Sequence, residues 1–560
     1  MKPLHRSVWV LMLLVSISAM GMADRGATDE ASVAGIVVDE SGPVAGAVVR
    51  VQTTDRATRT DVEGRFSLAA RSDDGALLLI AFAPGYVIVG PIEARPGERD
   101  VRFELHRHNL TDHPEYAWIS AYDQPDVEGN CAECHSAPAE EGLFLPFDEW
   151  VVDAHGNAAV NPRFLSMYNG TDRSGERKSP ETRYTYHKDY GRIPLPPDPN
   201  EPYYGPGYKL DFPDTAGNCA ACHLPAAAID DPYGTDPNQA EGVGREGVAC
   251  DFCHKVWDVR VDADTRLPVA NMPGVLSMDV LRPPEGHQLF IGPFDDVAPG
   301  EDTYSPLQDE SRYCAACHFG QFWGVTVYNS YGEWLSSPYA VPETGQTCQD
   351  CHMPRRGATR FALPEQGGLE RDPERIFSHR MPGALEEQLL RNAVSLDVRA
   401  MRQGKQLLVD VTVANDQTGH HVPTDSPLRN LILLVEATDS SGEMLEQLRG
   451  PQVPSWGGEG DPADGNYAGL PGKGYAKVLE QLWTEISPTG AYWTQTRVLS
   501  DNRLSAFTSE TTRYVFALPD DVEAEVHVRL WFRRAFKALM DQKGWRTPDI
   551  LMEEARVSVR

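Results

Sequence analysis

Residues 311–324 read Ser-Arg-Tyr-Cys-Ala-Ala-Cys-His-Phe-Gly-Gln-Phe-Trp-Gly, and the Cys-x-x-Cys-His pattern inside this stretch occurs five times in the chain. The five copies use all ten cysteines, and this pattern is the attachment signature of c-type haem. Two intervening residues let both sulfurs reach the vinyl groups on one edge of a porphyrin and form thioethers, and the following histidine can then bind the iron. The sequence therefore predicts five covalently attached haem c groups. The predicted attachment residues are Cys131, Cys134, Cys219, Cys222, Cys250, Cys253, Cys314, Cys317, Cys348 and Cys351, and the predicted proximal iron ligands are His135, His223, His254, His318 and His352.

Three other uses of paired cysteines fit the pattern less well. A disulfide framework would not place a histidine after every second cysteine. Thioredoxin-like redox pairs normally occur once per domain beside a βαβ pattern, which the sequence lacks. Zinc sites use Cys-x-x-Cys pairs two at a time, so five copies would leave one over and the histidines unexplained.

The number of further histidines bears on function, because a haem iron with one protein ligand is open to substrate and one with two is suited to electron transfer. Sixteen histidines are present, and ten of them lie outside the motifs and outside the first residues of the chain. Five haems could therefore all have two histidine ligands. His527 alternates with apolar residues and is expected to be structural, while the roles of His113 and His421 stay open. The predicted second ligands are His155, His187, His287, His379 and His420.

The first residues predict an exported protein. Lys2 and Arg6 precede an apolar run from Val8 to Met20, and the small residues Gly21 and Ala23 offer a cleavage site. The run is shorter than the ~20 residues that a membrane-spanning helix needs. We therefore expect residues 1–23 to be a cleaved signal peptide, no transmembrane segment in the mature chain, and a periplasmic or extracellular location.

The net charge of the chain restricts the kinds of molecule that it can bind. With 51 basic against 82 acidic residues the net charge is −31, and loss of the signal peptide would leave −33. This balance argues against binding to nucleic acid, which needs clustered Lys and Arg. It favours redox protein partners with a basic docking patch.

The length of 560 residues indicates three or four domains, and the pattern along the chain indicates three. Residues 32–108 and 384–560 show β-branched runs broken by turn residues, so each is predicted to form a β-sandwich. Residues 110–383 hold all five motifs and are predicted to form a loop-rich and α-helical pentahaem cytochrome c domain. The first cysteines of successive motifs are 88, 31, 64 and 34 residues apart, which suggests that the second and third haems, and the fourth and fifth, form pairs.

Two parts of the chain resemble known families. The pattern Gly35-x-Val37, the stretch 42–49 (Gly-Pro-Val-x-Gly-Ala-x-Val) and the stretch 60–66 (Thr-Asp-x-x-Gly-x-Phe) resemble the carboxypeptidase regulatory-like domain, a prealbumin-like β-sandwich. That resemblance implies a structural or docking role and no catalytic residues.

Residues 111–440 resemble exported multihaem cytochromes c of the cytochrome c-552/c-554 type. The matching stretches are SRYCAACHFGQFWG, YGEWLSSPYA, TCQDCHMPR, FSHRMPGA and TGHHVPTDSPLRNLIL. The resemblance implies that His379 and His420 are distal haem ligands, with His420 preferred over His421. Five motifs and two flanking β-domains depart from the compact four-haem carrier of that type, so its pathway is not transferred to this chain.

The favoured function is single-electron transfer along a chain of mostly bis-histidine haems, with no dedicated catalytic residues. One alternative is a multihaem oxidoreductase that acts on a small nitrogen or sulfur compound at one open haem. The Cys-x-x-Cys-Lys motif of pentahaem nitrite reductases is missing, which counts against that branch, but the hydroxylamine-oxidising type keeps Cys-x-x-Cys-His. Another alternative is an extracellular conducting assembly, which microscopy of secreted material would reveal as filaments. The oligomeric state, the partners' identities and the reduction potentials are not determined by the sequence.

Overall fold

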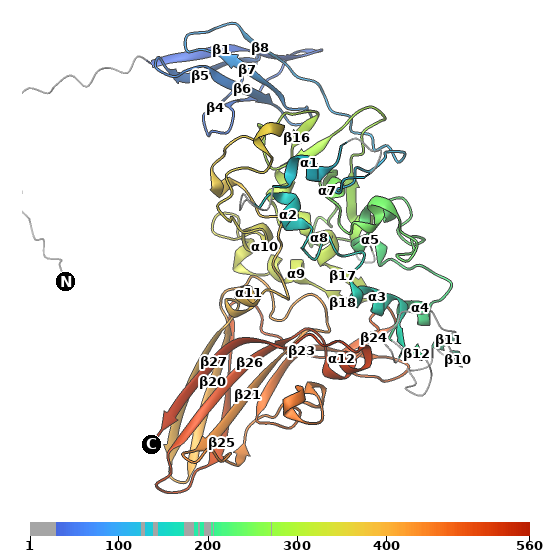
Figure 1. Cartoon of the computed structure of the whole chain (residues 1–560), viewed down its shortest axis with the longest axis vertical. Coiled ribbons are helices and arrows are strands. Elements are labelled where there is room, and N and C mark those ends of the chain that lie inside the picture. Colours follow the sequence, from blue (N-terminus) through green and yellow to red (C-terminus); the bar gives the residue numbers. More distant parts are fainter. Residues whose placement is uncertain are drawn as a thin grey trace, which may run out of the picture. The chain divides into compact units, whose positions relative to one another are not determined.

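The computed structural model describes residues 30–124, 129–137, 144–172, 184–188, 191–194, 203–204, 206–269 and 272–560. The predicted signal peptide lies outside these residues. The described chain is multi-domain, rich in short β-sheets and poor in helix (Figure 1). Residues 30–80 and 90–104 form one compact unit, and residues 81–89 and 105–560 belong to a second.

Two small sheets form at the N-terminal end, as the β-branched runs predict. One contains β2, β1 and β5 with β8 parallel to β1, and the other has the order β4-β3-β6-β7. Along β5 the residues alternate between exposed and buried, which places Phe66 and Leu68 on the inner face. The prealbumin-like identity of this region stays a prediction. The strands are β1 (Glu30–Asp39), β2 (Gly42–Pro43), β3 (Val48–Val51), β4 (Ala57–Arg59), β5 (Arg65–Arg71), β6 (Leu77–Phe82), β7 (Val89–Ala94) and β8 (Val101–Glu104).

The motif-bearing stretch contains only short elements. Its described helices have four to eight residues, so the predicted helical character is limited to single turns around the motifs and a few connecting pieces. The helices are α1 (Cys131–His135), α2 (Pro146–Trp150), α3 (Pro162–Asn169), α4 (Tyr208–Asp211), α5 (Ala220–His223), α6 (Pro225–Ala228), α7 (Cys250–Cys253), α8 (Arg312–His318), α9 (Ser330–Leu335) and α10 (Cys348–His352).

Two-stranded sheets connect these helices. The pairs are β10-β11, β12-β9, β13-β14, β15-β16 and β17-β18, and of these only β15-β16 is parallel. The strands are β9 (Thr171–Asp172), β10 (Tyr184–His187), β11 (Gly191–Pro194), β12 (Tyr203–Tyr204), β13 (Val256–Val259), β14 (Met278–Val280), β15 (Phe290–Gly292), β16 (Asp302–Tyr304), β17 (Gly320–Phe322) and β18 (Val325–Tyr328).

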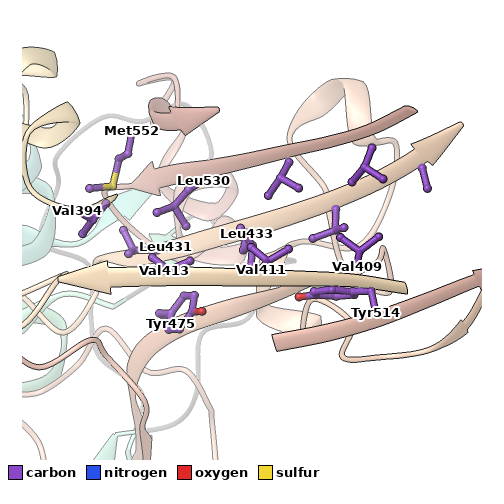
Figure 2. Packing of buried hydrophobic residues seen from close by; sticks show 14 of the residues in the cluster. Val394, Val409, Val411, Val413, Leu431, Leu433, Tyr475, Tyr514, Leu530 and Met552 are labelled. Atoms are coloured by element: carbon purple, nitrogen blue, oxygen red, sulfur yellow. The ribbon is translucent and has the colours of Figure 1, made fainter. Parts of the chain in front are cut away.

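Two antiparallel sheets pack face to face in the C-terminal stretch, with the orders β19-β20-β25-β22 and β24-β23-β21-β26-β27. In β20 the residues Leu407, Val409, Val411 and Val413 alternate with partly exposed ones, and all four are fully buried. Figure 2 shows Val409, Val411 and Val413 together with Leu431, Leu433 and Leu530 in this core. The elements are α11 (Glu387–Arg391), β19 (Ser395–Gln403), β20 (Gln406–Asn415), β21 (Asn430–Asp439), β22 (Gln447–Arg449), β23 (Gly472–Gln481), β24 (Thr496–Asp501), β25 (Thr508–Ala517), β26 (Ala524–Arg533), α12 (Lys537–Lys543) and β27 (Ile550–Val559).

The outer face of β21 is also buried, which explains its unbroken apolar run. Ile432 and Leu434 pack against Val453 and Trp456 from the Gly- and Pro-rich loop segment 452–474. The ring of Trp456 lies directly on Gly474, where an added Cβ would come within 2.1 Å of the indole. The loop therefore covers the sheet instead of projecting into solvent.

The motif-bearing stretch packs against the C-terminal sheets within one compact unit. Met167 of α3 shares a buried cluster with Trp493 and with Leu539 of α12. The Lys543 ammonium donates to the carbonyl of Ser166 at 2.8 Å. The predicted boundary between residues 383 and 384 thus lies inside a single compact unit, and the predicted domain ranges stay predictions.

Candidate haem centre

Each Cys-x-x-Cys-His motif coincides with a short helix, namely α1, α5, α7, α8 or α10 (Figure 1). Residues three apart lie on the same face of a helix, so the two cysteines of a motif point to one side. Helix α10 is fixed by a capping box in which the Thr347 hydroxyl accepts from the Asp350 N–H, while Asp350 bonds back to Thr347. All ten cysteines are free of disulfides.

The cysteine side chains show which motifs are neighbours in space. The nearby side chain of Cys131 raises the pKa of Cys250, and that of Cys348 raises the pKa of Cys314. In the same way, the nearby side chain of Cys222 raises the pKa of Cys317. The fourth and fifth motifs are thus adjacent, as the spacing suggests, whereas the first motif adjoins the third and the second adjoins the fourth.

The contacts of one short segment explain this order. After the third motif the chain forms β13 and then the 3-10 turn Gly274–Ser277, which contacts both α5 and α8. At Gly274 the backbone φ is +58° and an added Cβ would lie 2.1 Å from the Ala221 carbonyl oxygen, so only glycine fits. This close approach brings the second and fourth motifs together, a relation that sequence spacing alone does not reveal.

Three motif histidines face a second histidine from a distant part of the chain. The ring centroids are 6.4 Å apart for His254 and His379, and 6.2 Å apart for His352 and His420. The centroids of His155 and His318 are also 6.2 Å apart. Two imidazoles on one metal, with bonds of about 2 Å and ring centres about 1.1 Å behind each nitrogen, have centroids about 6.2 Å apart. The three pairs therefore have the spacing of two axial ligands on one iron.

Hydrogen bonds at Nδ1 select the tautomer that this ligation requires. Nδ1 of His254 lies 2.9 Å from the Ile291 carbonyl oxygen, and Nδ1 of His352 lies 2.7 Å from that of Pro382. Nδ1 of His420 lies 2.9 Å from the carbonyl oxygen of His421. A carbonyl oxygen can only accept, so in each ring Nδ1 carries the hydrogen and Nε2 keeps a lone pair for a metal.

Burial keeps these rings neutral, as metal ligands must be. Burial, with a smaller contribution from the facing His420, lowers the pKa of His352 to about 4. Burial and the facing His254 lower the pKa of His379 to about 3. Burial also lowers the pKa of His420. Together with the Nδ1 bonds and the ring spacing, this means that the residues present fit a haem iron with two histidine ligands.

The pair His155–His318 has a different environment. Nδ1 of His155 lies 2.9 Å from an Asp153 carboxylate oxygen, and Nδ1 of His318 lies 3.7 Å from one of Asp425. Burial lowers the pKa of His318, but the Asp425 carboxylate outweighs burial and raises it to about 9. The planes of the two rings are inclined by 61°, against 23° and 22° in the other two pairs.

Two buried glutamates fix the segments that carry His379 and His420. Glu149 of α2 accepts from the His379 N–H at 2.7 Å and from the Ser378 hydroxyl at 2.8 Å. Glu333 of α9 accepts from the His421 N–H at 3.1 Å and from the Thr424 hydroxyl. Each glutamate therefore holds the backbone beside a facing histidine in place.

Of the other two predicted ligands, His287 is the one whose side chain the structure describes, and it is not brought to a motif. The side chain of His287 is 57% exposed and its Nδ1 lies 2.9 Å from Glu301. His187 belongs to β10, but its side chain lies outside the described residues.

Two motif histidines have other neighbours. His223 stacks on Phe164 with centroids 3.9 Å apart, and Nδ1 of His135 faces the Phe361 carbonyl at 2.6 Å. Among the described rings neither His135 nor His223 faces a second histidine at axial distance. His527 lies between Glu436 and Glu554, which fits a structural role.

Sequence reasoning missed Asp153, Asp425, Glu149 and Glu333. None of them belongs to a motif, and the partners of the last two lie far away in the chain. The one local signal is the spacing Asp153-x-His155, in which the carboxylate accepts from both the backbone N–H and the ring of the histidine.

Short motif helices joined by small two-stranded sheets give a fold that is also found in a multihaem cytochrome c of known structure. Among solved structures, the penta-heme cytochrome c552 from Thermochromatium tepidum shares this fold. It aligns over 76% of this chain and 97% of its own, with a TM-score of 0.51 and 18% sequence identity. At that identity the likeness concerns the fold alone.

Two other structures align with 30% of the chain each, at TM-scores of 0.13 and 0.14, and carry no argument. They are the ASH/PapD-like domain of human CEP192 and AvmM, which catalyzes macrocyclization in alchivemycin A biosynthesis. No family model and no curated protein matches the chain. None of the helices that the structure describes has the length and apolar run that crossing a bilayer requires.

Proposed function

We propose that this protein is an exported c-type cytochrome that binds five haems covalently and transfers single electrons between redox proteins. The observation that carries the proposal is the set of three facing histidine pairs, His155–His318, His254–His379 and His352–His420, at axial spacing. Bound haem supplies a reversible one-electron change between ferric and ferrous iron.

The chain's own residues would hold and orient that group. The paired sulfurs of each motif would anchor it as thioethers, and the following histidine would supply the first nitrogen ligand. His155, His379 and His420 would supply the second nitrogen at three of the five sites. Two fixed nitrogen ligands leave no position for substrate on an iron, and the rigid Nδ1 bonds limit the rearrangement that accompanies a change of charge.

Haem content and spin state test this proposal together. We expect the exported protein, produced with a haem-attachment system, to carry five covalently bound haems per chain by mass spectrometry and by its pyridine haemochrome spectrum. Electron paramagnetic resonance (EPR) of the oxidised protein should show at least three low-spin ferric sites. Fewer than three low-spin sites would contradict the proposed ligands. A high-spin signal that shifts on adding nitrite or hydroxylamine would instead favour the multihaem oxidoreductase.

The acidic balance predicts the salt dependence of electron transfer to a partner. The net charge of −31, which becomes −33 without the predicted signal peptide and is made more negative by haem propionates, attracts a basic docking patch over a range set by ionic screening. We expect the second-order rate with a basic redox protein to fall by about tenfold or more between about 20 mM and about 300 mM NaCl. Stopped-flow measurements with basic and acidic small-protein partners provide the comparison. A rate that does not change with salt would rule out electrostatic docking.

A further inference from the structure

The carboxylates Asp153 and Asp425 set the fourth motif apart from the other described sites. They lie against Nδ1 of His155 at 2.9 Å and of His318 at 3.7 Å, one carboxylate for each ring of the pair. In contrast, Nδ1 of His135, His254, His352 and His420 all face backbone carbonyl oxygens.

Both carboxylates are held by further contacts. Asp153 is 5% exposed and accepts from the N–H groups of His155 at 2.8 Å and Met381 at 3.1 Å. Asp425 lies 3.5 Å from the Ser330 hydroxyl and 3.9 Å from the Arg429 guanidinium. Its backbone φ of +64° is in the left-handed region, which aspartate tolerates better than most residues. The two negative charges therefore stay beside the imidazoles.

A carboxylate at Nδ1 gives the imidazole more negative character than a neutral carbonyl does. A more basic ligand donates more charge to the metal and favours the higher oxidation state, and the hydrogen bonding of axial ligands is one of the main controls of haem potential. The effect is larger where water is excluded, because charges interact more strongly at low dielectric.

The fourth motif also touches three others. Its Cys314 lies beside Cys348 of the fifth motif, and its Cys317 lies beside Cys222 of the second. The Tyr313 hydroxyl of α8 donates to the carbonyl of Cys253, in the third motif, at 2.9 Å. A site with a different reduction potential at this position would influence how electrons are distributed among all the neighbouring sites.

We propose that Asp153 and Asp425 give the iron held by His155 and His318 the lowest reduction potential among the three paired sites, at the meeting point of the second, third and fifth motifs. This inference rests on the proposed function. Asp153 and Asp425 are positioning residues, since they act through the histidines and do not touch the iron.

The ring geometry supplies a signal for this one site. In low-spin ferric haem the angle between the two imidazole planes governs the anisotropy of the EPR spectrum, and a large angle gives a highly anisotropic signal. The His155–His318 planes are inclined by 61°, whereas the planes of the other two pairs are inclined by only 23° and 22°. The highly anisotropic signal can therefore be followed separately during a potentiometric titration.

The test compares wild-type protein with Asp153→Asn, Asp425→Asn and Asp153→Glu, using EPR-monitored redox titration of the full-length holoprotein. In wild type, the highly anisotropic signal should be reduced after the rhombic signals of the other two pairs. At a fixed potential each Asn variant should raise the ferrous-to-ferric ratio of this site by about tenfold, equivalent to about 59 mV for one electron. Asp153→Glu keeps a carboxylate charge at this position, so most of the shift seen in Asp153→Asn should be absent and the ratio should lie close to the wild-type value.

Asp258→Asn is the matched control. Asp258 pairs with Arg312, the first residue of α8, and does not touch either histidine. We expect Asp258→Asn to change the ferrous-to-ferric ratio of the site by less than about threefold. The Asp258 carboxylate is exposed and paired with Arg312, so solvent and that guanidinium screen its charge. Equal shifts in the control and in the Asp153 and Asp425 variants, or no shift in either variant, would overturn the inference. So would an anisotropic signal that is reduced first in wild type. Absence of low-spin signals from wild type would instead defeat the proposed function.

Discussion

Replacing His420 by alanine is expected to turn one low-spin ferric site into a high-spin site. His420 faces His352 at a centroid distance of 6.2 Å, and alanine has no atom that could replace its nitrogen. The iron held by His352 would keep one protein ligand and become accessible to water or small anions. Because axial ligation controls haem potentials over a range of about 0.8 V, we expect the potential of this site to rise by on the order of 100 mV.

EPR of the oxidised protein measures this change directly. One rhombic low-spin signal should disappear and a high-spin signal of about one iron per chain should replace it. His379→Ala should produce the same change at the site of His254, which it faces at 6.4 Å.

His527→Ala is the matched control, because that ring contacts Glu436 and Glu554 and no motif residue. It should leave every signal unchanged. An His420→Ala protein that retained all its low-spin signals would show that His420 is not a ligand, and the adjacent His421 would then be tested in the same way.

The expected role of His420 shows which residues of the haem centre can be predicted from the sequence. The motifs identify the cysteines and the first ligands, because thioether attachment requires one short, fixed spacing. Facing histidines have no such local rule. His155 and His287 are both single histidines in irregular segments, yet only His155 is brought to a motif histidine, whereas His287 is exposed beside Glu301. Long-range packing makes that difference.

The fold shows the same division between local and long-range information. Alternation along Leu407 to Val413 predicts β20, because one face of the strand is buried and the other is not. The apolar run in β21 predicts a strand without showing what covers its second face. The covering residues, Val453 and Trp456, belong to a Gly- and Pro-rich segment that has no strand pattern of its own.

Among the substitutions proposed for this chain, removal of the Glu333 carboxylate is expected to cause the largest loss of folding stability. Its side chain is 1% exposed and lies 2.9 Å from the Arg503 guanidinium, which is 5% exposed. The same carboxylate accepts from the His421 N–H and the Thr424 hydroxyl, so it joins α9 to the segment after β20. Loss of Glu333 would leave Arg503 with Asp501 alone, at 2.8 Å, and would remove the buried acceptor of the His421 N–H and the Thr424 hydroxyl. We therefore expect Glu333→Ala to lower the free energy of unfolding by about 3–5 kcal/mol.

Two comparisons make this measurement specific. Glu333→Gln keeps the acceptor oxygen but loses the charge, so it should destabilise by a smaller amount, about 1–3 kcal/mol. Glu387→Ala removes an exposed carboxylate that pairs with Arg391 at 3.5 Å on α11, and it should change stability by less than about 1 kcal/mol. Chemical denaturation of the holoproteins, followed by near-ultraviolet circular dichroism, gives the three values. Because Glu333 also fixes the backbone beside His420, Glu333→Ala should in addition broaden the EPR signal of that site, whereas Glu387→Ala should not. If the two alanine variants were equally stable, the buried pair would contribute no more to the fold than an exposed one.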